Sequence, residues 1–440
     1  MEAIVWVRMR NDVEGYASDA EIQATLVRKL LENYSTSTRP ALNSSIPTLV
    51  THRITPIQIL DIDEQNQLFT LKVWIGLRWT DELLRWNESD YAGVASVSVS
   101  SNDIWQPDIT LYGSVDKEFE RHLSTDAQVS SDGSVLALQP MVFKASCRID
   151  ATYFPFDEQK CILKFGSWSY DGSLIDLEIN PSSGSLSNYI PNGEWSLIGL
   201  PIIKHVLYYA CCPEPYPDIT YTFVIRRRSL FYIYTLLMPV MLMFILILVG
   251  FYLPTECGER MTLFVTSMLS LFVFLSLASQ YLPPTSDSTP YIQIYLMSTI
   301  GLVALSSILT GFSINLHYLA SDCSPVPGWM RICVFKYIAA IVLLQNKTKP
   351  FLKATENSKH TEGDDDIHIP LVGEGSGDMS AIDIKAPSYI TSLPESVQEW
   401  RMVAVVVDRL FMVLYLILFV SITAGIFMFL ENRHGHFSTH

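Results

Sequence analysis

Charged side chains are missing from four long stretches of this sequence, although 17% of its residues are charged. The stretches cover residues 229–255, 261–286, 288–316 and 410–430. Each is long enough to form a helix that crosses about 30 Å of hydrocarbon. A soluble protein with four buried core helices is the alternative, but such helices would carry polar stripes, and the mean hydropathy of +0.24 is high for a soluble chain. The sequence therefore predicts four membrane spans.

The patterns of common enzyme sites are also missing. The sequence contains no metal-spaced histidine cluster, no nucleophile elbow and no phosphate-binding glycine loop. We therefore expect no enzyme activity, no cofactor or metal site and no nucleic-acid partner. The net charge of −15 favours a surface that concentrates cations.

Cysteine is scarce, with seven in 440 residues, and four of the seven precede the first charge-free stretch: Cys147, Cys161, Cys211 and Cys212. Paired cysteines outside a metal-binding pattern favour an oxidising, extracellular compartment. Three N-glycosylation sequons fall in the same region, at Asn33, Asn43 and Asn87. We therefore place this region outside the cell.

Hydrophobic periodicity changes along the chain. Helical spacing of apolar residues predicts an amphipathic helix over residues 21–34. Short β-branched and aromatic runs, such as residues 68–75 and 219–225, then alternate with turn residues from about 48 to 225. Many short strands separated by turns are typical of a β-sandwich.

The predicted domains follow from these patterns. Residues 1–228 form an extracellular domain, 229–316 the first three spans, 317–403 a cytoplasmic loop, 404–430 the fourth span and 431–440 an extracellular tail. The loop should contain a short amphipathic helix near 325–338, a disordered acidic linker over about 354–380 and a helix leading into the fourth span. Asp408 and Arg409 would lie at the membrane boundary, where snorkelling makes the charge pair tolerable.

The first residues lack the apolar stretch of a secretory signal, so we expect that a signal was removed or that the sequence is truncated.

The segment from Cys147 to Cys161 carries the most specific motif. Thirteen residues separate the two cysteines, and Phe154-Pro155-Phe156-Asp157 lies at the centre. With four spans behind it, this segment resembles the defining loop of the Cys-loop receptors, which are pentameric ligand-gated ion channels. The resemblance extends over about residues 21–430 except the linker. It implies a Cys147–Cys161 disulfide, an extracellular immunoglobulin-like β-sandwich with an N-terminal helix, and a four-helix transmembrane bundle. The apolar tip is expected to be exposed and to need a surface to pack on.

Three further segments look like the principal-face loops of a nicotinic acetylcholine receptor α-type subunit. They are residues 105–112 (WQPDITLY), 166–172 (GSWSYDG) and 209–218 (YACCPEPYPD). The resemblance implies a ligand site made of Tyr112, Trp168, Tyr209, Tyr216 and a disulfide between the adjacent Cys211 and Cys212. Two free thiols are the alternative for that cysteine pair. Aromatic faces attract an organic ammonium by cation–π interaction, so the expected partner is a small cationic neurotransmitter-like ligand, with acetylcholine as the family default.

The same resemblance assigns a complementary face, which a neighbouring subunit would add to the site. Trp74 matches its aromatic residue, and Leu136 and Leu138 supply aliphatic cover. Because one chain offers both halves of the site, we expect a homopentamer or a heteropentamer with related subunits.

The second span has the pattern of a pore-lining helix. Polar and aliphatic residues recur at alternating steps of four and three and form one helical stripe: Thr262, Thr266, Leu269, Val273, Ser276 and Gln280. Hydroxylated residues at one end and aliphatic residues in the middle are typical of a water-lined helix with a hydrophobic gate. Glu259 would form a carboxylate ring at the cytoplasmic mouth that favours permeant cations. Phe264, Phe272 and Phe274 are expected to pack against other helices.

Charge also suggests how binding and pore are coupled. Glu64 and Arg227 align with an acid and an arginine that pair in relatives, at the membrane face of the sandwich. The same coupling is expected to involve the tip of the Cys147–Cys161 segment, Phe154, Pro155 and Phe156. A solvated charge that pairs with nothing is the alternative.

Together the resemblance implies a subunit of a neurotransmitter-gated, cation-selective channel in the plasma membrane, surrounded by membrane lipid, with a postsynaptic location typical of the family and both termini outside. A related receptor for serotonin, and a ligand-binding subunit that needs partner subunits to conduct, are the alternatives. A soluble or adhesive ligand-binding protein would explain the sandwich but not the four spans.

Overall fold

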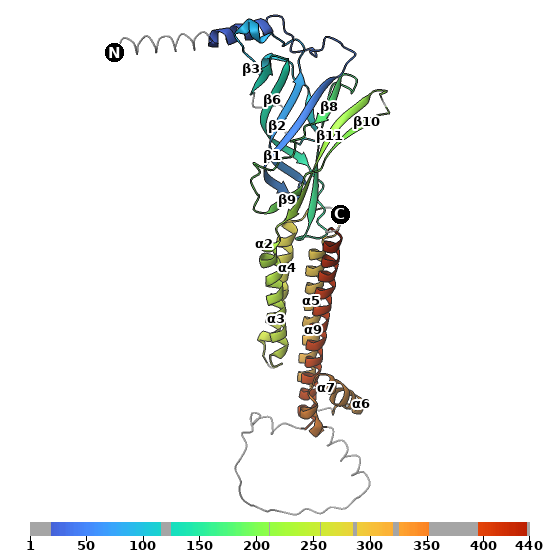
Figure 1. Cartoon of the computed structure of the whole chain (residues 1–440). Coiled ribbons are helices and arrows are strands. Elements are labelled where there is room, and N and C mark those ends of the chain that lie inside the picture. The colour runs from blue at the N-terminus through green and yellow to red at the C-terminus, as the bar shows by residue number, and fades with distance from the viewer. Residues whose placement is uncertain are drawn as a thin grey trace, which may run out of the picture. The chain divides into compact units, whose positions relative to one another are not determined.

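The computed structural model describes residues 19–115, 125–210, 212–255, 257–284, 288–319, 325–351 and 395–437. The chain divides into two compact units. Met1–Ser229 and Gln280–Ser288 form the first, and Leu230–Ser279 and Thr289–His440 form the second. Figure 1 shows strands throughout the first unit and long helices in the second.

One sheet of the first unit has six strands. They are β1 (Thr48–Asp63), β2 (Leu68–Thr80), β3 (Ser96–Ser100), β5 (Asp126–Ser130), β6 (Ser134–Ser146) and β8 (Ile175–Ile179), in the order β3-β5-β6-β2-β1-β8. All neighbours are antiparallel except β1 and β8. Alternation along β2 buries Phe69, Leu71 and Val73 on one face.

The other sheet has five strands. They are β4 (Ile109–Tyr112), β7 (Glu158–Ser167), β9 (Trp195–Gly199), β10 (Ile202–Tyr208) and β11 (Pro215–Arg227). The order is β10-β11-β7-β4, and β9 pairs with the last part of β11. Its inner face meets that of the first sheet in a single core, where the rings of Phe69 and Phe223 lie 5.5 Å apart. This confirms the predicted β-sandwich.

A helix over residues 19–31 packs on the sandwich and buries Leu26 in the core. Just after it, the hydroxyl of Tyr34 donates a hydrogen bond to Asp81 Oδ2 at 2.6 Å and accepts one from the Trp105 backbone N–H at 3.0 Å. The predicted amphipathic helix is thus present, and a partly buried polar contact holds its C-terminal end.

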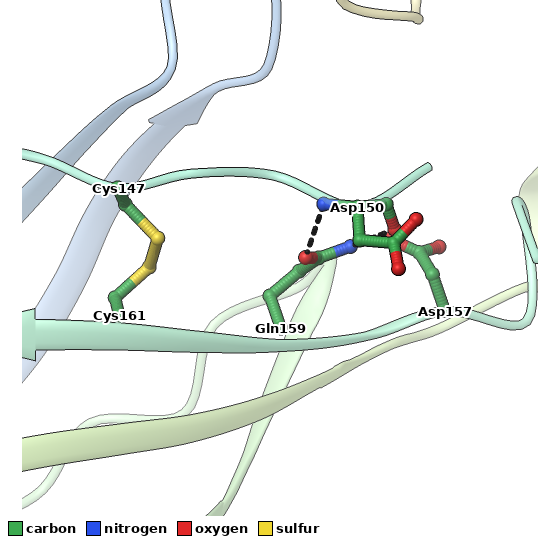
Figure 2. The surroundings of a disulfide bond; sticks show 5 residues. All are labelled: Cys147, Asp150, Asp157, Gln159 and Cys161. Atoms are coloured by element: carbon green, nitrogen blue, oxygen red, sulfur yellow. Dashed lines mark hydrogen bonds between the residues drawn. A yellow bond between two sulfur atoms is a disulfide. The ribbon is translucent and has the colours of Figure 1, made fainter. Parts of the chain in front are cut away.

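The Cys147–Cys161 disulfide is formed, which confirms the prediction (Figure 2). Within the enclosed segment, the Gln159 side chain accepts a hydrogen bond from the Asp150 N–H at 3.0 Å and donates to the Asp150 carbonyl at 2.9 Å. It also donates to Asp157 Oδ2 at 2.6 Å. These bonds close the loop on itself and fix the carboxylate of Asp157.

Among its described residues, the second unit has four helices long and apolar enough to cross a membrane. The first runs from Leu230 to Tyr252 as α2 (Leu230–Tyr232), a π-helical segment η3 (Ile233–Leu237) and α3 (Met238–Tyr252); the others are α4 (Glu259–Gln280), α5 (Tyr291–Leu319) and α9 (Glu395–Phe437). The π-helical turns end just before Pro239, which has no N–H to donate to the preceding turn. The four predicted spans are confirmed, and the chain is a multi-pass membrane protein.

A short helical segment follows α5, as expected near residues 325–338. It consists of α6 (Gly328–Ile332), a π-helical turn η5 (Cys333–Ile338) and α7 (Ala339–Ile341). Phe335 packs with Trp400 of α9 in a buried cluster, and Arg331 donates to Glu399. The predicted linker over 354–380 lies outside the described residues, and α9 continues to Phe437 through most of the expected tail.

Candidate functional site

Four aromatic side chains gather around the end of β7. The rings of Tyr112, on β4, and Trp168, just after β7, are 6.1 Å apart, and those of Tyr209 and Tyr216, on the β10–β11 hairpin, are 5.6 Å apart. Burial, followed by the proximity of Tyr209, raises the pKa of Tyr112 to about 12. Tyr112 lies against Gly166 of β7, which is opposite Asp218 of β11, two residues after Tyr216. The two ring pairs are therefore neighbours, and the structure brings the predicted principal-face aromatic residues together.

Tyr112 is held in place by the end of β7. Its hydroxyl donates to the Ser167 carbonyl at 2.7 Å. A Cβ added to Gly166 would lie only 2.4 Å from that hydroxyl, so glycine is needed here for the ring to lie against the strand.

Asp108 fixes the turn that carries Trp168. Its carboxylate accepts from the Ser167 hydroxyl at 2.5 Å and from the Ser169 N–H at 2.7 Å. The Trp168 side chain itself is 75% exposed. The two hydrogen bonds therefore fix the turn that exposes this large aromatic surface.

A cavity of about 460 Å³ lies beside the rings of Tyr112 and Trp168. It is lined by Asp108, Thr110, Leu111, Tyr112, Gly113, Ser114, Trp168 and Ser169. The volume falls within the usual range for small-molecule sites. Among the described residues, no group of three or more His, Cys, Asp or Glu side chains could hold a metal ion.

The tip of the β10–β11 hairpin carries the cysteine pair. Tyr208 and Pro215 form the last strand pair, and the Cys212 N–H donates to the Tyr209 carbonyl at 3.1 Å. Cys212 is disulfide-bonded. Cys211 lies outside the described residues, so its bond to Cys212 stays a prediction.

The predicted complementary-face residues lie on the other sheet. In the β2–β6 register, Trp74 is opposite Pro140, Gly76 is opposite Leu138, and Arg78 is opposite Leu136. Residues two apart on paired strands share a face, so the three predicted side chains form one row. Trp74 is 46% and Leu138 51% exposed, which leaves apolar surface open to a neighbour.

Sequence reasoning missed a charged cluster beneath the aromatic residues. Lys164 on β7 pairs with Asp218 Oδ2 on β11 at 2.9 Å, and His205 Nδ1 on β10 lies 3.1 Å from Asp218 Oδ1. The available signal was Asp218 itself, an acid at the start of the run of alternating apolar residues that forms the rest of β11. An acid in that position requires a cationic partner.

Arg227 is the centre of a second charged cluster. It donates to Asp157 Oδ1 at 2.8 Å, to Glu64 Oε1 at 2.8 Å and to Glu194 Oε1 at 3.1 Å. Its guanidinium lies 4.1 Å from the Trp195 ring centroid and 4.9 Å from that of Phe154. Burial opposes its charge, but the carboxylates raise the pKa of Arg227 above its ordinary value, while burial raises the pKa of Glu64.

The predicted Glu64–Arg227 pair is therefore present, as one arm of a larger cluster. The expectation of an exposed apolar tip is wrong for Phe154, which is 1% exposed, and Pro155 is buried as well. Phe156 is half-buried. The aromatic face of Phe154 is used to cover the buried guanidinium instead.

On α4, all seven residues assigned to the pore are exposed in the single chain: Glu259, Thr262, Thr266, Leu269, Val273, Ser276 and Gln280. Phe264 and Leu271 are buried on the other side of the helix, whereas Phe272, expected to pack, is 46% exposed. The Thr266 hydroxyl donates to the Thr262 carbonyl at 2.8 Å. One face of α4 thus packs inside the unit and the predicted stripe does not.

A buried ion pair fixes the rotation of α4. Arg260 donates to both carboxylate oxygens of Asp408 on α9, each at 2.6 Å. Arg409 lies 4.4 Å from the centroid of the Tyr252 ring. The snorkelling prediction is therefore wrong for Asp408, which is buried and paired with Arg260, and it stays a prediction for Arg409.

Two family models match the chain. A neurotransmitter-gated ion-channel ligand binding domain matches residues 23–229, and a neurotransmitter-gated ion-channel transmembrane region matches residues 236–389. The chain is 38% identical over 360 residues to neuronal acetylcholine receptor subunit alpha-9 of Gallus gallus, covering 81% of this chain and 73% of the relative. The chain belongs to the neurotransmitter-gated ion-channel family. This confirms the resemblance drawn from the Cys147–Cys161 segment.

Other members of the neurotransmitter-gated ion-channel family are similar to the same extent. Subunit alpha-9-II of Oncorhynchus mykiss is 39% identical over 350 residues, 78% of this chain and 64% of the relative. Subunit alpha-3 of Rattus norvegicus is 40% identical over 332 residues, 76% of this chain and 66% of the relative. The chain thus spans less than two thirds of the Oncorhynchus relative. Family members are pentameric ligand-gated channels, not enzymes.

Proposed function

We propose that this chain is a subunit of a nicotinic acetylcholine receptor-like, cation-selective channel that a small organic ammonium ligand opens. The observation that carries the proposal is the aromatic cluster of Tyr112, Trp168, Tyr209 and Tyr216, with a cavity of about 460 Å³ beside Tyr112 and Trp168. Four electron-rich ring faces suit a cation that is too bulky to be strongly hydrated. The relatives named as acetylcholine receptor subunits make acetylcholine the first ligand to test.

The site is completed between subunits. The aromatic cluster lies on the five-stranded sheet, whereas Trp74, Leu136 and Leu138 lie on the six-stranded sheet. Two faces of one chain supply the two halves, so five copies, or a mixture with related subunits, can form the complete site.

Cations pass along the stripe of α4. Leu269 and Val273 form the hydrophobic gate, and Glu259 provides a ring of carboxylates at the cytoplasmic mouth. The sandwich faces the outside of the plasma membrane, at postsynaptic sites, and carries glycans. The disulfide and the three exposed sequons, Asn33, Asn43 and Asn87, support that orientation.

Expression of the full chain in oocytes tests the proposal. The chain is expressed alone and with a related subunit, and acetylcholine, choline, tetramethylammonium and serotonin are applied in turn. An inward current that reverses with the sodium gradient is the expected result. Current evoked only by serotonin, or reversal at the chloride potential, would refute the assignment of ligand or of selectivity.

Trp168→Ala examines the site directly. Loss of the most exposed aromatic face should weaken the binding of a quaternary ammonium ligand by about 1 to 2 kcal/mol, between the values for an exposed and a desolvated cation–π contact. Tyr208→Ala is the matched control, because Tyr208 is an exposed aromatic residue of the hairpin outside the predicted set. Equal affinities of the Trp168→Ala variant and the unaltered chain would exclude the aromatic cluster as the site.

A further inference from the structure

Three polar side chains share the carboxylate of Asp218. The side chain of Asp218 is 3% exposed. Lys164 Nζ lies 2.9 Å from Oδ2, His205 Nδ1 lies 3.1 Å from Oδ1, and the Thr220 hydroxyl donates to Oδ1 at 2.9 Å. The imidazole of His205 is 43% exposed, so protons reach it from solvent.

This cluster belongs to the ligand site by position. Asp218 is opposite both His205 on β10 and Gly166 on β7, and Gly166 is the residue on which Tyr112 rests. Lys164 Nζ lies 5.9 Å from the centroid of the Tyr112 ring. A change of charge on Asp218 or its partners is therefore felt where an organic cation would bind.

The charge balance depends on His205. With a neutral imidazole, one carboxylate faces one ammonium group. With an imidazolium, two cations share one buried carboxylate, and the cluster gains a positive charge. The other charge on this part of β10, Lys204, is paired with Asp176 of β8 at 2.7 Å. Histidine is the side chain that ordinarily changes its charge between about pH 5 and 8.

We propose that His205 is a positioning residue that makes ligand binding pH-dependent: when protonated, it adds a second cation to Asp218 beside Lys164 and weakens the binding of organic cations. The inference rests on the proposed function of the aromatic cluster. A unit charge on the order of 10 Å from the ligand in a solvent-exposed site changes affinity about two- to fourfold.

His52, the other histidine described in the sandwich, does not produce the same effect. It is fully buried, and burial lowers its pKa to about 3. It therefore stays neutral between about pH 5 and 8.

The test is equilibrium binding of tritiated acetylcholine to cell membranes that contain the full chain, alone and with a related subunit, between about pH 5.5 and 8. Acetylcholine is a quaternary ammonium ester, so its own charge is constant. The unaltered chain should bind about two- to fourfold more weakly at the acidic end. His205→Gln should bind at the high-affinity level at every pH, and His205→Lys, with a permanent charge, at the low-affinity level at every pH.

The possible results distinguish a failure of the proposed role of His205 from a failure of the proposed function. A His205→Gln variant that keeps the full pH dependence, or an unaltered chain without any, overturns the role of His205. A His205→Gln variant that loses the same factor in affinity at every pH would show that His205 has only a structural role. His205→Asn replaces His205→Gln if surface labelling shows that the latter does not reach the membrane. Absence of acetylcholine binding by the unaltered chain at neutral pH would refute the proposed function itself.

Discussion

Acid should destabilise the β-sandwich through one residue, His52. This histidine lies on β1 with no exposed surface, and its ring centroid is 4.8 Å from that of Phe165. Its Nδ1 lies 2.7 Å from the Tyr221 hydroxyl, while its Nε2 has no hydrogen-bond partner among the described residues. Protonation would place a charge in an apolar core, and burial accordingly lowers the pKa of His52 from 6.5 to about 3.

The sign and size of this effect on the free energy of unfolding follow from proton linkage. Between about pH 6.5 and 3 the unfolded chain binds a proton at this histidine and the folded chain does not, so the free energy of unfolding falls as the pH falls. At about pH 5 the loss amounts to about 2 kcal/mol relative to neutral pH. For a unit of this size, about 2 kcal/mol corresponds to a fall of roughly 4 to 8 °C in melting temperature.

Thermal unfolding of the purified full chain near pH 8 and pH 5 measures the effect. His52→Phe keeps a ring of similar shape and leaves the Tyr221 hydroxyl 3.1 Å from Ser183 Oγ. The acid-induced fall should therefore shrink by about 2 kcal/mol in this variant, whatever its stability at neutral pH. His205→Gln, which alters a half-exposed histidine, serves as the control and should retain the full fall. An identical fall in His52→Phe and in the unaltered chain would refute the reasoning.

Three further predictions concern the pore and the Arg227 cluster. Glu259→Ala should reduce the preference for sodium over chloride, measured as reversal potentials in salt gradients, and an unchanged preference would contradict the carboxylate ring. Leu269→Thr should raise the open probability without ligand by easing hydration of the gate, whereas Leu271→Thr, on the buried side of α4, should disturb packing; single-channel recording that gave the reverse pattern would disprove the proposed register. Arg227→Gln should lower the free energy of unfolding by about 3 to 5 kcal/mol, because it leaves the buried carboxylate of Asp157 without its cation. This variant should lose surface labelling, and adding Asp157→Asn should restore it.

Much of the fold could be predicted from local patterns. Alternation of apolar residues predicted β2 and the C-terminal part of β11, and the absence of charge predicted the four spans, because both signals come from residues close together in the sequence. The stripe of α4 was predictable for the same reason. Side-chain exposure follows the period of the helix, and Leu269 at 64% and Leu271 at 1% differ accordingly.

Pairings between distant residues could not be predicted in this way. Arg260 and Asp408 are 148 positions apart, so only the packing of α4 against α9 reveals that they meet. Asp218 meets Lys164 and His205 because of the register of three strands, and a one-residue slip would turn Asp218 to the opposite face. Phe154 looked like an exposed tip because its cover, Arg227, comes from another strand.

The proposed division of the ligand site between two sheets has a consequence for assembly. In a single chain Trp168 is 75% and Trp74 46% exposed, although a large aromatic surface gains most from burial. A neighbour that covers Trp168 with Trp74 and Leu138 removes both surfaces from water and also completes the proposed site. A ligand that contacts both halves then binds the assembled form more tightly than the separate chain, and by linkage it stabilises that assembly in the same proportion. In this proposed arrangement interface packing and ligand affinity depend on the same aromatic residues, so we expect a substitution at Trp74 to affect both.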